Sequence, residues 1–166
     1  MSSWVREDLV DAPLADVERA VLDPATLPRI AERAPMIARA EVVDRRAEAR
    51  SITRVVRMHA ALTPPSFLRL LDGNELSWLE TVVWDLDAHR GHFSIAPNLR
   101  EERRHLFRCE GEYALLPAAA GTLRRVRAEI DARVRIVGPL VERLVATQLD
   151  LQLRVEAEVL RELCAR

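Results

Sequence analysis

Hydrophobic and polar residues repeat with a period of two through most of the chain and with a helical period near both ends. The clearest alternation lies in "TLRRVRAEIDARVRI" (122–136), where apolar residues at even positions from Val126 to Ile136 alternate with charged residues. This pattern is typical of an antiparallel strand with one buried face and one solvated face. Comparable stretches indicate further strands at residues 3–12, 36–45, 51–62, 76–87, 91–98 and 105–117.

Three segments instead have apolar residues at helical spacing. "LADVERAVLD" (14–23) follows Pro13, and "PATLPRIAERAP" (24–35) contains three prolines, so the two predict short, separate helices. Pro139 favours the start of a last helix that continues to Ala165, a length of roughly 40 Å. No linker or change of composition divides the chain, which indicates one domain over residues 1–166. The predicted class is α+β: one strand, two short helices, about six more strands and a long helix.

This order of elements resembles the START-like helix-grip superfamily, which includes polyketide cyclases and lipid-transfer domains. More narrowly, the chain resembles a family of uncharacterised bacterial START-like domains. The matching segments are "TPPSFLRLLDG", "WLETVVWDLDAHRGHFSIAPN", "CEGEYALLPAAAGTLRRV" and "RIVGPLVERLV". The resemblance implies a curved antiparallel sheet of about six or seven strands wrapped around the last helix, with an apolar cavity between them. These motifs are specific to a fold rather than to a reaction.

The amino-acid composition limits the classes of molecule that the protein is expected to bind. The hydrophobic fraction of 49% and charged fraction of 31% are typical of a globular domain. All 25 basic residues are arginine, but the net charge of -1 provides no basic field for nucleic acid. Cys109 and Cys164 have neither metal-binding spacing nor the number needed for a disulfide framework. No signal peptide or long apolar run is visible, so we expect a cytoplasmic protein without a cofactor.

Two glutamines of the last helix are the most informative polar residues. On a helical wheel, Gln148 and Gln152 fall within the apolar stripe that contains Leu144, Leu151 and Val155. Burying an amide without a partner costs about 1–3 kcal/mol, so each side chain needs a partner. Either they line a cavity and orient the polar end of a ligand, or they bond strand backbone or solvent at the edge of the interface.

Other candidates surround the same expected cavity. Trp78 and Trp84 share one face of their strand, where they could contact a ligand or fill the core; Met58 has the same two alternatives. Phe67, in "TPPSFLRLL", could cover the cavity mouth and touch a membrane transiently, or it could belong to a small cluster closing the sheet. A second apolar edge of the last helix, formed by Leu149, Leu153 and Leu160, could support a homodimer or pack the short helices of a monomer.

Catalytic and metal chemistry have weaker support. Asp85, Asp87, His89 and His92 lie across a strand end and a turn, which scatters them as metal ligands, so no metal site is predicted. No serine lies in a nucleophile motif. The ionisable groups that could act in a cavity are Glu110, Glu112, His59 and Arg54, and none of them is predicted to be catalytic.

The preferred hypothesis is binding or transport of a hydrophobic small molecule such as a lipid, isoprenoid, quinone or polyketide. The alternatives are an enzyme of the cyclase or aromatase kind that uses the same cavity, and a protein-interaction module that uses the long helix.

Overall fold

The computed structural model describes residues 1–65 and 67–165 and confirms the predicted α+β order. The helices are α1 (Leu14–Leu22), α2 (Thr26–Arg33), the 3-10 helix η1 (Glu101–Leu106) and α3 (Gly138–Cys164). The strands are β1 (Ser2–Val10), β2 (Ile37–Ala47), β3 (Ser51–Ala60), β4 (Ser77–Asp85), β5 (Arg90–Pro97), β6 (Phe107–Ala118) and β7 (Gly121–Ala132).

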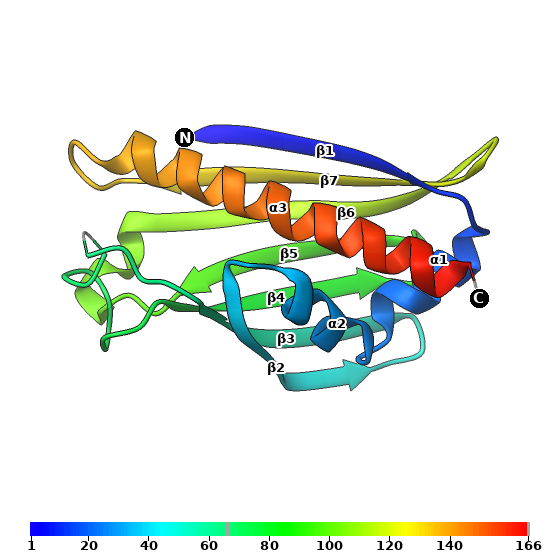
Figure 1. The fold of residues 1–166 in the computed structure, drawn as a ribbon, viewed down its shortest axis with the longest axis horizontal. Helices are drawn as coiled ribbons and strands as arrows, with labels where there is room; N and C mark the ends of the chain where they lie inside the picture. Colours follow the sequence, from blue (N-terminus) through cyan, green and yellow to red (C-terminus); the bar gives the residue numbers. More distant parts are fainter. Residues whose placement is uncertain (66, 166) are drawn as a thin grey trace.

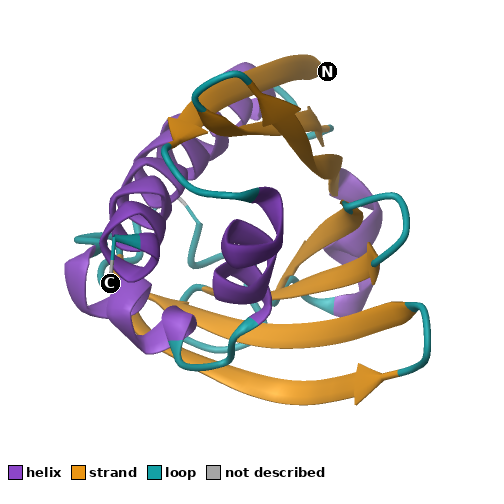
Figure 2. Cartoon of the chain, turned by 90° about the vertical axis from the view of Figure 1, so that its right-hand side faces the viewer, coloured by secondary structure: helices purple, strands orange, loops and turns teal. Residues whose placement is uncertain are grey.

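The seven strands form one antiparallel sheet in the order β1-β7-β6-β5-β4-β3-β2. Strands β2 to β7 pair in chain order, while β1 joins β7 at the other end of the row. Viewed along the strands, the sheet follows an open curve, and the helices occupy its open side (Figure 2). Helix α3 runs diagonally across this concave side and contacts β7, β1, α1 and α2 (Figure 1). The predicted helix-grip arrangement is therefore confirmed.

Two glycines allow large rings to lie flat on the concave face. Trp84 on β4 is opposite Gly91 on β5, and Phe93 on β5 is opposite Gly111 on β6. A Cβ atom on Gly91 would lie 2.6 Å from the Trp84 ring, and one on Gly111 would lie 2.0 Å from the Arg127 backbone oxygen and 2.5 Å from the Phe93 ring. A side chain at Gly91 would displace the Trp84 ring, and one at Gly111 would also displace the backbone of β7, so both positions require glycine.

The strand predicted to run to Ile136 is shorter than the alternation suggested. Ala128, Ile130 and Ala132 are buried as expected, but β7 ends at Ala132, which pairs with Phe107, the first residue of β6. Beyond that pair β7 has no hydrogen-bonding neighbour on β6, and residues 133–137 turn toward α3. Ile136 in this turn has a φ of 73° and is 91% exposed, so its predicted place on the buried face is wrong.

The buried face of α3 agrees with the predicted stripe in part. Val141 and Val159 of that stripe are buried, but Leu140 is 67% exposed, and the second apolar edge at Leu149, Leu153 and Leu160 is buried with Ala157. The helix packs against α1 and α2 as well as the sheet, so two apolar stripes are needed and the wheel alone does not identify which one faces the strands. Among the described residues, no helix has the combination of length and apolarity required to cross a bilayer.

Candidate ligand-binding site

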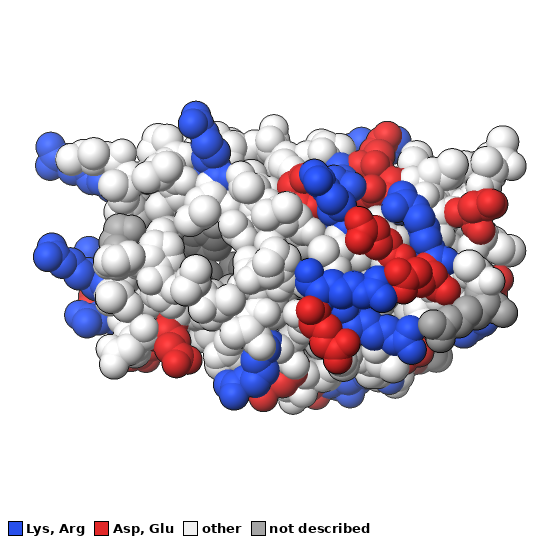
Figure 3. Space-filling view, viewed as in Figure 1, with Lys and Arg blue, Asp and Glu red and all other residues white. Residues whose placement is uncertain are grey.

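Two adjoining cavities lie between the sheet and α3. The outer cavity has a volume of about 140 Å³ and is surrounded by α3, residues 67–76, β4, β5, η1 and the turn before α3. The inner cavity has a volume of about 60 Å³ and lies deeper, among α1, β3, β4, β6 and α3. Leu149 and Gln152 belong to the walls of both. The face shown in Figure 3 is hollowed beside the first half of α3, in the region of the outer cavity.

The outer cavity is almost entirely apolar. Its wall includes Phe67, Trp78 and Leu144, and its polar lining residues are Arg103, Gln148 and Gln152. The side-chain oxygen of Gln148 is buried and accepts no hydrogen bond from the described residues. A buried acceptor without a donor is costly unless water or a ligand satisfies it, so this oxygen is a candidate contact for a bound molecule.

The inner cavity gathers ionisable groups from four elements. Arg54 on β3, Glu80 on β4, Tyr113 on β6 and Glu156 on α3 line it, together with Gln152. The Arg54 guanidinium donates to the Val21 carbonyl at 3.3 Å and lies 3.8 Å from Glu80, while its Nε is buried without a partner among the described residues. The inner cavity therefore has at least one hydrogen-bond donor that the described residues leave unused.

Glu80 is the carboxyl group most perturbed by this environment. Burial raises its pKa above the ordinary value; the positive charge of Arg54 opposes the rise, the negative charge of Glu156 adds to it, and a hydrogen bond from Gln152 opposes it. A carboxyl group that retains its proton at higher pH can donate a hydrogen bond to a carbonyl or hydroxyl oxygen. Glu80 thus differs chemically from the surface carboxylates of the same sheet.

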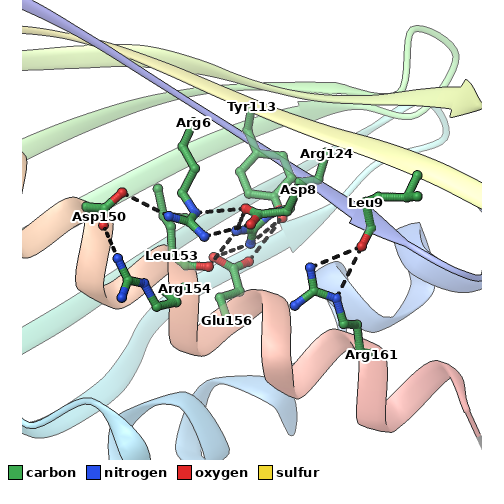
Figure 4. Close-up of polar contacts among 10 residues, drawn as sticks. All are labelled: Arg6, Asp8, Leu9, Tyr113, Arg124, Asp150, Leu153, Arg154, Glu156 and Arg161. Carbon is green, nitrogen blue, oxygen red and sulfur yellow. Dashed lines mark hydrogen bonds and ion pairs between the residues drawn. The ribbon is translucent and has the colours of Figure 1, made fainter.

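A buried ion network supports the side of the inner cavity near β1 and β7 (Figure 4). Arg124 is fully buried and binds Asp8 at 2.7 Å, Glu156 at 3.3 Å and the Leu153 carbonyl at 2.5 Å. Arg6 continues the network from Asp8, at 2.7 Å, to Asp150 on α3, at 2.9 Å. These contacts join β1, β7 and α3, so they fix the helix against the sheet beside the site.

Tyr113 and Trp84 connect this network to the cavity wall. The Tyr113 hydroxyl donates to Glu156 at 3.2 Å, and burial raises the Tyr113 pKa, so the phenol stays protonated. The Trp84 ring meets the Tyr113 ring edge-on with centroids 5.5 Å apart, and the indole N–H donates to Glu18 of α1 at 2.8 Å. Both aromatic rings are therefore held in one orientation.

The structure places most of the predicted ligand-binding residues around the two cavities. Phe67, Trp78, Leu144 and Gln148 line the outer cavity, Trp84 lines the inner one, and Gln152 lines both. Met58, Leu151 and Val155 are not lining residues of either cavity. Met58 packs in a separate cluster with Leu27 and Ile37, and the other two are half-buried on the side of α3 away from its most buried stripe.

Of the four ionisable groups considered for catalysis, Arg54 lines the inner cavity, whereas the other three line neither the inner nor the outer cavity. Glu110 is exposed and pairs with Arg108 at 2.7 Å, Glu112 lies 3.8 Å from Arg90, and His59 lies 3.0 Å from Arg39. Within the described residues, no group of three or more His, Cys, Asp or Glu side chains is arranged to hold a metal ion. Burial raises the pKa of Cys109 to about 12, which leaves its thiol unreactive as a nucleophile.

Sequence reasoning missed Glu80, Glu156, Arg124 and Asp8. Two signals were available: Glu80 has the same parity as Trp78 and Trp84, and Arg124 has the same parity as Val126 and Ile130. A charged residue whose position in the alternation places it on the buried face of a strand needs a partner of opposite charge. The sequence does not show which distant residue supplies that partner.

Comparison with known proteins places the chain in a family. Residues 9–164 match the sequence profile described as "Protein of unknown function (DUF2505)". The chain belongs to this family. None of the curated proteins compared with this DUF2505 chain matches it.

Solved structures similar to this DUF2505 chain share its fold. The protein TTHA0849 of Thermus thermophilus is 22% identical with a TM-score of 0.68, covering 99% of this chain and 97% of that one. The ZhuI aromatase/cyclase of Streptomyces sp. R1128 is 12% identical with a TM-score of 0.68, covering 99% and 94%. A STAR-related lipid transfer protein of Xanthomonas axonopodis is 14% identical with a TM-score of 0.60, covering 95% and 84%. The expected START-like fold is thereby confirmed.

Proposed function

We propose that this DUF2505 chain binds a hydrophobic small molecule, such as a lipid, isoprenoid, quinone or polyketide, between the sheet and α3. The apolar body would occupy the outer cavity, and an oxygen-bearing group would reach the inner cavity past Gln152. The observation that carries the proposal is the shared wall: an apolar space adjoins, at Leu149 and Gln152, a second space whose wall also carries charged groups. Small-molecule sites typically combine such an apolar lining with a few placed polar groups.

The unused hydrogen-bonding atoms of the wall support this arrangement. The Gln148 oxygen offers an acceptor in the outer cavity, and the Arg54 Nε offers a donor at the inner one. The names of two similar solved structures, an aromatase/cyclase and a lipid transfer protein, refer to functions that act on small molecules or lipids. Fold similarity at this level of sequence identity supports a hydrophobic small molecule as the class of ligand.

The present volumes limit what fits without rearrangement. Ligand pockets of drug-sized molecules usually measure about 300–1,000 Å³, whereas a cavity of about 150 Å³ accepts a molecule as small as benzene. At about 140 Å³ the outer cavity matches a single ring. A longer ligand therefore requires Gln152 or the Phe67 segment to move aside.

The proposal can be tested by native mass spectrometry of protein purified gently from its own host. We expect a co-purifying lipid-sized molecule that is lost from Leu144→Trp, because the larger side chain fills the outer cavity. Leu140→Trp is the matched control: it lies one turn earlier on α3 and is 67% exposed, so it should retain the molecule. If the wild-type protein carries no molecule and binds no apolar probe such as 2-naphthol, the proposed function is wrong.

An enzyme of the cyclase or aromatase kind is a second candidate, favoured by the carboxyl group of Glu80 in the wall of the inner cavity, whose pKa is raised by burial. Such an acid could donate to a carbonyl oxygen of a reactive chain held in the same cavities. Glu80→Gln keeps the size and a donor but cannot release a proton. If turnover occurs, wild type and Glu80→Gln should co-purify with molecules of different mass; identical masses favour simple binding.

A further inference from the structure

One end of the molecule exposes five aliphatic side chains around the outer cavity. We call them the end patch: Leu62, Leu68, Ile136, Val137 and Leu140. Ile136, Leu62 and Leu140 are 91%, 86% and 67% exposed. The segments that carry the patch lie at the same end of the fold (Figure 1). They are residues 61–65 and 67–76, the turn at 133–137 and the start of α3. They also supply Phe67, Val134 and Leu144 to the wall of the outer cavity.

Neither the backbone conformation nor the exposure of Ile136 favours the stability of the fold. Its φ of 73° lies in the left-handed region, where a β-branched residue is strained and glycine is the usual choice. An exposed isoleucine at this position therefore combines backbone strain with unburied apolar surface. Such violations of local rules concentrate at functional surfaces.

The charges beside the end patch include five arginines without a carboxylate partner among the described residues. Arg69, Arg103, Arg104, Arg135 and Arg143 are exposed and form no ion pair there. Taken together, the segments 62–76, 99–106 and 133–143 carry seven arginines and five carboxylates, whereas the whole chain has 25 basic and 26 acidic residues. The nearby carboxylates are Asp72, Glu75, Glu101, Glu102 and the buried Glu142. Arginine side chains project from this end around a largely uncharged surface (Figure 3).

We propose that the end patch docks on an anionic lipid membrane. The aliphatic side chains enter the boundary between headgroups and acyl chains, and the surrounding arginines contact lipid phosphates. Exposed apolar residues beside an excess of arginines over carboxylates match both layers of such a surface. The proposal concerns the outer surface and holds whatever the cavities bind. For an apolar ligand, docking would place the outer cavity next to the bilayer.

Vesicle co-sedimentation tests the docking directly. We expect the protein to sediment with vesicles of phosphatidylcholine and phosphatidylglycerol in equal parts, less at high salt, and not with pure phosphatidylcholine. Ile136→Ser with Leu140→Ser should weaken binding about tenfold or more, and Arg135→Gln with Arg143→Gln should weaken it about tenfold. The control is Val5→Ser with Leu9→Ser, because these residues of β1 are 57% and 44% exposed but lie outside the patch. Equal binding by both serine pairs would overturn the proposal.

Ile136→Gly separates docking from folding. Glycine tolerates the left-handed backbone, so this variant should have a higher melting temperature than wild type while binding the mixed vesicles more weakly. Unfolding cannot produce that combination. Failure of the wild type to sediment with anionic vesicles contradicts docking. Docking is also contradicted if the wild type is a dimer in analytical ultracentrifugation and the double substitution Ile136→Ser with Leu140→Ser dissociates that dimer.

Discussion

The inner and outer cavities adjoin along α3, yet they are built in different ways. Around the inner cavity, paired strands and α3 contribute charged groups that bind one another, as in the contacts of Arg124 with Asp8 and Glu156. Around the outer cavity, connecting segments complete a wall of apolar side chains that begins on strands and α3, and the Gln148 oxygen has no donor among the described residues. Paired strands can hold charges in register and so support a fixed polar site, whereas the connecting segments give the apolar space a part that can be reshaped.

The largest expected effect tests whether the polar side is structural. Asp8→Ala leaves the buried Arg124 without its closest carboxylate, which should lower the free energy of unfolding by about 3–5 kcal/mol. Glu7→Ala is the matched control, because Glu7 pairs with Arg125 on the exposed face of the same two strands. That loss should be about 0–1 kcal/mol. Urea denaturation measures both, and similar losses would remove the distinction between the two faces.

A smaller effect, of the opposite sign, is expected on the apolar side. Gln148→Leu removes a buried oxygen that lacks a donor and adds apolar surface to the wall of the outer cavity. It should raise the free energy of unfolding by about 1 kcal/mol while weakening the binding of probes that carry a hydroxyl on an apolar ring, such as 2-naphthol. Equilibrium denaturation and probe fluorescence report the two changes. A loss of stability would show that the Gln148 amide is satisfied in solution.

The smallest expected effect is a change in how steeply the free energy of unfolding varies with pH. In the unfolded chain Glu80 ionises near its ordinary pKa of 4.5, whereas burial raises its pKa in the folded protein. Between these two values the folded protein keeps a proton that the unfolded chain releases, so stability falls as pH rises. Glu80→Gln removes this loss, and its stability relative to wild type should increase as the pH rises above 4.5.

Glu110→Gln is the control for this slope. The hydrogen bond from Arg108 lowers the pKa of Glu110, so its ionisation favours the folded state as pH rises. This contribution lies below the ordinary pKa of 4.5, so Glu110→Gln should lose stability relative to wild type as the pH rises toward 4.5 and keep a constant difference above it. Glu80→Gln, in contrast, gains stability above 4.5. Denaturation midpoints measured on both sides of this pH decide the sign; the same sign for both variants would contradict the buried environment assigned to Glu80.

The order of elements, the alternation on β7 and the long last helix were predictable because each depends on local periodicity. The register that opposes Asp8 to Arg124 was not predictable, since it depends on β1 returning to pair with the seventh strand. Leu140 and Leu149 have the same hydrophobicity, but one is exposed and the other is buried. Only the positions of α1, α2 and the sheet decide between them. The cavities were beyond the sequence because a packed interior uses the same residues.

The shared wall at Leu149 and Gln152 has a consequence for ligand length. A molecule that occupies both spaces must be narrow where it passes these two side chains and must carry its polar group a set distance from its apolar bulk. Joining two fragments across that constriction makes the second contact intramolecular, so the joined molecule binds more tightly than either fragment. Affinity along a homologous series should then reach a maximum at one chain length instead of rising steadily with hydrophobicity.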